Sequence, residues 1–166
     1  MTPLPVVWAA SFLLVASGAA KIRHPAEAIP ALRAVGLNAH RYAVVLLGAI
    51  EIVVGAGALS GISRGFYAAM AFLYIWFTVF SVRLAILRIP GMSCGCAGRR
   101  DLPPSWVHVV LNVAAVLSAV AASATDPVPR NSDLLMLSVG SLAIAWAAYL
   151  VVAYVPTLFS SYRSAQ

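Results

Sequence analysis

The chain has 166 residues, of which 62% are apolar and only 10% are charged, and its formal net charge is +6. About a quarter of the residues of an ordinary soluble domain are charged, so this composition excludes that class. It favours a chain whose apolar surface is covered by lipid. The basic residues stand at the ends of apolar runs, which is typical of anchoring at lipid headgroups. We therefore expect the basic side chains to interact with the lipid bilayer and not with nucleic acid.

Five apolar segments are about 17–25 residues long, the length that a helix needs to cross a bilayer. In chain order they cover residues 4–20, 42–60, 66–87, 104–124 and 134–159. No basic residue precedes the first segment, whereas a signal peptide begins with a positively charged region, so we expect a retained helix. The predicted fold class is all-α, a polytopic membrane helix bundle without a soluble domain.

The longest connection, residues 21–41, contains a second pattern. Ile29, Leu32 and Val35 recur at three-residue spacing in a stretch that also contains Pro25 and Pro30. This spacing predicts a short amphipathic piece that lies at the membrane interface.

The basic residues divide unevenly between the two sides that five spans define. Two of them, Arg64 and Arg130, fall on one side. The other nine fall on or close to the opposite side: Lys21, Arg23, Arg33, Arg41, Arg83, Arg88, Arg99, Arg100 and Arg163. Because cytoplasmic loops carry the excess of Lys and Arg, this count predicts an outside N-terminus and a cytoplasmic loop 88–101.

The loop 88–101 contains two cysteines, Cys94 and Cys96, separated by one glycine. Such a pair can close a small disulfide ring if a turn brings the two Cα atoms within about 4.4–6.8 Å. A tight ring of this kind is strained and exchanges readily. Arg99 and Arg100 follow directly, and their charge favours the thiolate over the thiol. The motif indicates a redox-active dithiol. The alternative is a pair of inert cysteines at a helix end.

A metal site is a weaker interpretation of the same cysteines. Cys94, Cys96 and His108 supply three ligands, whereas a structural zinc ion usually takes four. We therefore expect no metal.

Polar side chains within or beside the apolar segments gather in the half nearest the cysteines, among them Lys21, Glu51, Arg83, His108 and Asn112. Ionisable groups in a span are costly and usually face the bundle interior with a partner. We expect Glu51 to pair with Lys21, Arg83 or His108. Glu51 and His108 either move protons during chemistry or hold helices together, and both interpretations stay open. Lys21 and Arg83 have headgroup anchoring as their alternative.

Four stretches of the sequence resemble one family of small membrane proteins. They are residues 17–21 (Ser-Gly-Ala-Ala-Lys), 51–55 (Glu-Ile-Val-Val-Gly), 94–98 (Cys-Gly-Cys-Ala-Gly) and 106–112. Together they resemble the methylamine utilisation protein MauE family, part of the wider DoxX-like group. The resemblance implies a four-helix domain over residues 1–124. Residues 125–166 would then add a loop, a fifth transmembrane helix and a short tail.

The resemblance also implies a function. It suggests maturation of the small subunit of methylamine dehydrogenase, a disulfide-rich periplasmic protein, together with a thioredoxin-like partner. Cys94 and Cys96 would be the redox pair, and Lys21 and Glu51 would be polar residues of the bundle core. The chain departs from the family pattern at Ala97, where an aromatic residue is usual, at Leu111, where arginine is common, and in its fifth span.

These patterns leave three functions to compare. The first is a thiol–disulfide oxidoreductase or maturation factor in the bacterial inner membrane, exchanging with a thioredoxin-like protein and a secreted or membrane client. A periplasmic client requires the cysteines on the periplasmic side of the membrane, whereas the count of basic residues predicts the cytoplasmic side.

A quinone is a candidate cofactor that could pack on the aromatic residues of segment 66–87. The second is a non-catalytic subunit of a respiratory complex, with glycines 48, 55 and 57 packing helices. The third, a small-solute carrier, lacks the repeats of transporters.

Overall fold

The structure of the protein, a computed structural model, describes residues 4–87, 106–125 and 138–150. These residues form helices joined by short turns, and they contain no strand. The labelled helices are α1 (Leu4–Arg23), α2 (Pro25–Ala34), α3 (Arg41–Ser60), α4 (Arg64–Leu87) and α5 (Trp106–Thr125). A sixth, Ser138–Leu150, follows them. The expected all-α fold class is confirmed.

Four of the helices, α1, α3, α4 and α5, are long and apolar enough to cross a membrane. They correspond to the first four predicted spans, with ends that differ by a few residues. The helix Ser138–Leu150 is shorter. It lies within the predicted fifth span, and the rest of that span lies outside the described residues. The outward surface of the long helices carries large apolar side chains, as contact with lipid requires; among the most exposed are Leu46, Phe72, Val110 and Leu117.

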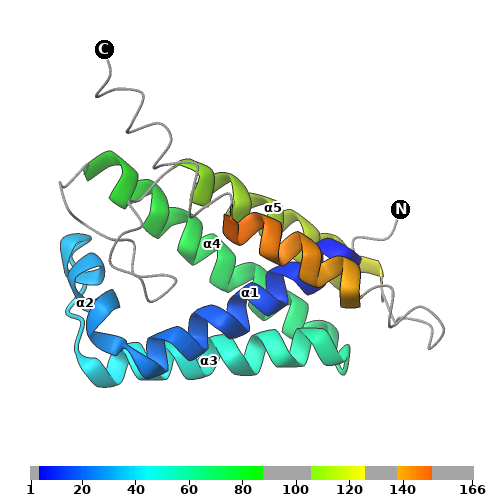
Figure 1. The fold of residues 1–166 in the computed structure, drawn as a ribbon, viewed down its shortest axis with the longest axis horizontal. Coiled ribbons are helices and arrows are strands. Elements are labelled where there is room, and N and C mark those ends of the chain that lie inside the picture. The colour runs from blue at the N-terminus through cyan, green and yellow to red at the C-terminus, as the bar shows by residue number, and fades with distance from the viewer. Residues whose placement is uncertain (1–3, 88–105, 126–137, 151–166) are drawn as a thin grey trace, which may run out of the picture.

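The four long helices alternate in direction, so one end of the bundle collects four helix termini. There α1 ends, α3 begins, α4 ends and α5 begins, and α2 packs between α1 and α3 (Figure 1). We call this the α2 end. The helices pair as α1 with α3 and α4 with α5. The segment 88–105, which contains both cysteines, is attached to the bundle through Leu87 and Trp106, at the α2 end.

Glycines let α1 and α3 approach closely. A Cβ atom added to Gly18 would lie 2.5 Å from the carbonyl oxygen of Gly48, and one added to Gly48 would lie 2.7 Å from that of Gly18. Two turns after Gly48 on α3, a Cβ on Gly55 would lie 2.9 Å from the carbonyl oxygen of Ser11. Small residues at membrane helix contacts bring backbones together in this way. The contact fixes which faces of α1 and α3 meet.

Side-chain hydrogen bonds join α4 to its neighbours. The Tyr74 hydroxyl donates to the carbonyl oxygen of Ala10 on α1 at 2.7 Å. The Asn112 amide on α5 donates to the Ser81 hydroxyl on α4 at 3.3 Å. The first bond joins the two helix pairs, and the second strengthens the contact within the α4–α5 pair.

The connection between α1 and α3 forms the predicted short piece, as helix α2. Its buried residues are Pro25, Ala28 and Ala31. Ile29 and Leu32 are only half-buried. The difference from the predicted stripe has a steric reason: a small face packs more closely on the ends of α1 and α3 than a bulky one.

Candidate functional site

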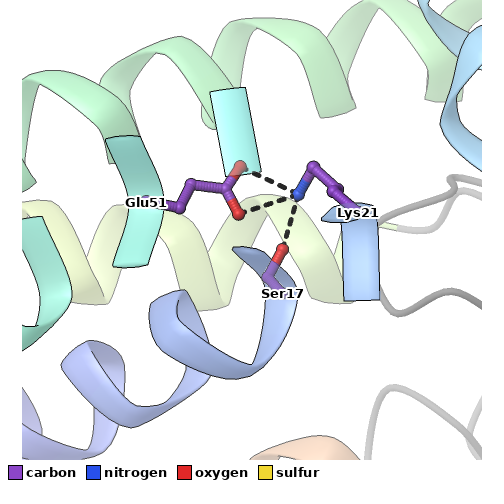
Figure 2. A network of polar contacts seen from close by, with 3 residues as sticks. All are labelled: Ser17, Lys21 and Glu51. Atoms are coloured by element: carbon purple, nitrogen blue, oxygen red, sulfur yellow. Dashed lines mark hydrogen bonds and ion pairs between the residues drawn. The ribbon is translucent and has the colours of Figure 1, made fainter. Parts of the chain in front are cut away.

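A buried ion pair joins α1 to α3 near the α2 end. Lys21 Nζ lies 2.8 Å from Glu51 Oε1 and donates a hydrogen bond to Glu51 Oε2 at 2.9 Å. It donates a further hydrogen bond to Ser17 Oγ at 2.6 Å. Figure 2 shows the three side chains converging between the two helices. The ammonium group therefore donates two hydrogen bonds and makes one further ion-pair contact, each to an oxygen atom.

Burial makes this pair costly to disturb. The Glu51 side chain has no exposed surface and that of Lys21 is 6% exposed. Removing one partner of a buried pair leaves an uncompensated charge in a low-dielectric interior. Ionisable residues in spans generally face the interior with a partner, as these two do.

Local sequence explains the geometry. Ser17 and Lys21 are four residues apart, so they lie on one face of α1. A long side chain on a helix leans towards the N-terminus, so Lys21 reaches from the end of α1 into the bundle. Gly18 lies on the same face and opposes Gly48, which is one turn before Glu51. The glycine contact thus sets the helix spacing at which the ammonium group reaches the carboxylate.

A cavity of about 280 Å³ lies beside the ion pair, between α1, α4, α5 and the helix Ser138–Leu150. Lys21 and Ser17 line it from α1. The Lys21 ammonium also lies 5.5 Å from the centre of the Phe77 ring, which lines the cavity from α4. This is within the range of a cation–π contact.

The remaining polar lining comes from α4, α5 and the sixth helix: Ser81, His108, Asn112, Tyr74 and Tyr149. His108 is 9% exposed. Most of these groups gather at the α2 end, in the half of the bundle where the sequence predicted the polar residues. The arrangement places an ammonium group, an imidazole, an amide and hydroxyl groups around one space.

The structure brings some of the predicted site residues together and separates others. Lys21, His108 and Asn112 line the same cavity, and Glu51 contacts Lys21 directly. Of the three partners considered for Glu51, the ion pair is with Lys21, and the Arg83 side chain is exposed. Glu51 therefore pairs with Lys21, one of the three predicted partners, where the glycine contact brings α1 and α3 together.

Four further predicted residues, Cys94, Cys96, Arg99 and Arg100, lie outside the described residues. Within the described part of the chain, no group of three His, Cys, Asp or Glu side chains could hold a metal ion.

Sequence reasoning missed two polar residues of the cavity, Ser81 and Tyr149. Ser81 follows Tyr74 by seven residues, which is two helical turns, so the two lie on one face of α4. That spacing was a usable signal. Tyr149 had none, because its place depends on how the sixth helix packs.

Comparison with known proteins places the chain in a family. The family model described as methylamine utilisation protein MauE matches residues 2–125. No curated protein and no solved structure matches the chain significantly. The matched range contains α1 to α5 and the cysteine motif, and it ends where α5 ends. The chain therefore belongs to the methylamine utilisation protein MauE family.

Proposed function

We propose that this membrane protein exchanges a disulfide with a partner protein through Cys94 and Cys96, in the maturation of a client of methylamine utilisation. The observation that carries the proposal is the Cys-Gly-Cys motif in the segment that links α4 to α5. Membership of a family tied to methylamine utilisation supports the process. The polar groups that gather at the α2 end support placing the exchange at this end of the bundle, where the cysteine segment is attached.

The exchange balances as a two-electron reaction. The thiolate of one cysteine attacks a disulfide sulfur of the partner, and a mixed disulfide forms as the partner's other sulfur leaves as a thiolate. The second cysteine then attacks the mixed disulfide and releases the partner as a dithiol. The chain is oxidised to its Cys94–Cys96 disulfide, and the partner gains two electrons and two protons. The reverse sequence oxidises the partner.

Other residues have supporting roles in this proposal. Arg99 and Arg100 follow the cysteines and favour the thiolate form. His108, two residues after the start of α5, is a candidate to carry protons. The Lys21–Glu51 pair holds α1 against α3. The partner is a thioredoxin-like protein, the client is a secreted or membrane protein, and the membrane is the bacterial inner membrane.

Redox trapping in cells tests the proposal. Cells expressing the full chain are quenched with acid, and free thiols are alkylated with a reagent that shifts the mass of the chain. We expect an oxidised and a reduced population whose ratio changes with the thiol redox state of the cell. The Cys94→Ser and Cys96→Ser variants should each lose the oxidised form and the maturation activity, while the adjacent Ser93→Ala variant keeps both. A chain that is always reduced, with full activity in both cysteine variants, would reject the proposal.

The second candidate, a non-catalytic subunit, predicted that glycines 48, 55 and 57 pack helices closely and that the fifth helix docks on another protein. Gly48 and Gly55 face α1, and a Cβ on Gly57 would overlap the Phe66 ring of α4. These glycines pack helices within the chain, and because either function allows such packing, they do not favour the subunit over the oxidoreductase.

A further inference from the structure

The cavity beside the Lys21–Glu51 pair is long and narrow. Its lining on α1 runs from Val6 to Lys21, 15 residues further along the helix. At 1.5 Å per residue this is about 22 Å. A volume of about 280 Å³ spread over that length fits a slender molecule and not a compact one.

Polarity is confined to one end of this cavity. Ser17, Lys21, Ser81, His108 and Asn112 stand at the α2 end, and beyond Tyr74 the α1 side is lined by Leu14, Leu13, Ala10, Ala9 and Val6. The Tyr74 hydroxyl is already bonded to the Ala10 carbonyl oxygen. A matching ligand has one polar head and a long apolar tail, which excludes sugars and amino acids.

Charge narrows the class of head group. Lys21 is the cationic residue that lines the cavity, and the Glu51 carboxylate lies 2.8 Å from its ammonium group. The two charges cancel within the bundle. A phosphate-bearing lipid head would face no net positive charge here and would lose its hydration on entry. A neutral head is favoured.

Aromatic and amide groups indicate what that head is. The Phe77 ring lines the polar end and packs edge-on against Tyr74, with ring centres 6.0 Å apart. A flat ring can stack on Phe77. Asn112 uses one amide proton on Ser81, at a long 3.3 Å, and has a second to donate to a carbonyl oxygen.

We propose that this cavity binds an isoprenoid quinone, with its ring between Phe77 and Asn112 and its tail along α1 towards Val6. Entry from the membrane is consistent with the lining, because Val6 and Ile144 are each 41% exposed on the lipid-facing surface. The redox role of the quinone, unlike its binding, rests on the proposed function. A Cys94–Cys96 dithiol would give two electrons and two protons to the quinone, forming the disulfide and the quinol.

Direct binding tests the proposal. The purified full-length chain is placed in phosphatidylcholine nanodiscs and titrated with radiolabelled decylubiquinone. We expect saturable binding that unlabelled decylubiquinone displaces and phosphatidylglycerol does not. Ala148→Phe fills the cavity and should weaken binding by about tenfold or more, which corresponds to about 1.4 kcal/mol. Ala147→Phe, on an exposed position of the same helix outside the lining, should bind like the wild type.

A second variant tests the proposal independently if Ala148→Phe does not fold. Asn112→Leu removes the amide at the polar end without adding bulk, and it should also weaken binding. No saturable binding, equal affinity in the Ala147 and Ala148 variants, or displacement by phosphatidylglycerol as effective as by quinone would overturn the proposal. Binding is also measured in a double Cys94→Ser, Cys96→Ser variant, which should equal the wild type. Failure of thiol exchange and failure of quinone binding are thereby scored separately.

Discussion

The Lys21 ammonium group and the Glu51 carboxylate, 30 residues apart in sequence, lie 2.8 Å apart in the interior of the bundle. They join α1 to α3 at the level where the cavity has its polar end. The same ammonium group also contacts Ser17 and faces Phe77. One side chain therefore links the packing of the bundle to the lining of its cavity.

Substitutions of Lys21 and of Glu51 should have strongly non-additive effects on the free energy of unfolding. Glu51→Gln leaves the Lys21 ammonium buried without its counter-charge, so we expect a loss of about 3–5 kcal/mol in the free energy of unfolding. Lys21→Met should cost a similar amount, because it strands the carboxylate. The double variant should be more stable than the sum of the two losses predicts. Unfolding in mixed detergent micelles measures all three. Strictly additive losses would contradict a direct pair.

Close packing of α1 on α3 should tolerate no added methyl group at Gly48. Gly48→Ala places a Cβ against the backbone oxygen of Gly18, and we expect a loss of about 1–3 kcal/mol. Gly140→Ala is the matched control, because a Cβ there meets nothing within 4 Å. It should stabilise its helix by about 0.5–1 kcal/mol. Thermal unfolding of the two variants measures both effects, and a similar melting temperature would argue against the close contact.

The hydrogen bond from Tyr74 to Ala10 should contribute measurably to joining the two helix pairs. Tyr74→Phe removes the hydroxyl from a buried site, and we expect a loss of about 1 kcal/mol. Tyr42→Phe is the control, since the Tyr42 side chain is 81% exposed. The two variants are compared by unfolding under the same conditions. An equal effect would mean that the Tyr74 bond is not made in the membrane.

The basic residues predict the side of the membrane on which the cysteines lie. Lys21, Arg23, Arg33 and Arg41 are at the α2 end, where α4 and α5 also attach the cysteine segment, and Arg64 is at the other end. We therefore expect a membrane-impermeant maleimide to label Cys94 and Cys96 only after cells are permeabilised. Labelling in intact cells after mild reduction would instead place the disulfide outside, next to a secreted client.

Much of this fold follows from the sequence. Long apolar runs predicted the four spans, because a bilayer demands about 20 apolar residues per helix. Glu51 stood out as a residue that needs a partner. The choice among Lys21, Arg83 and His108 did not follow from sequence, because a span that is apolar on every side does not reveal its orientation. Gly18 and Gly48 make that choice through backbone contact.

The cavity could not be predicted for a related reason. It forms where α1, α4, α5 and the helix Ser138–Leu150 leave space between them, and Ala148 and Tyr149 reach it from a helix far along the chain. No local pattern marks such a space. The face of α2 was also missed, because the small residues Ala28 and Ala31 pack inward in place of the bulkier Ile29 and Leu32.

The most direct test of the account is to trap the exchange intermediate. Cys94→Ser and Cys96→Ser variants of the full chain are expressed in methylamine-grown cells, alkylated, and separated without reductant, and any covalent partner is identified by mass spectrometry. We predict that one variant accumulates a mixed disulfide with a thioredoxin-like protein or its client. Reductant should release the partner, and the double variant should capture none. If neither variant captures a partner and both mature the client as the wild type does, thiol–disulfide exchange is not the function of this protein.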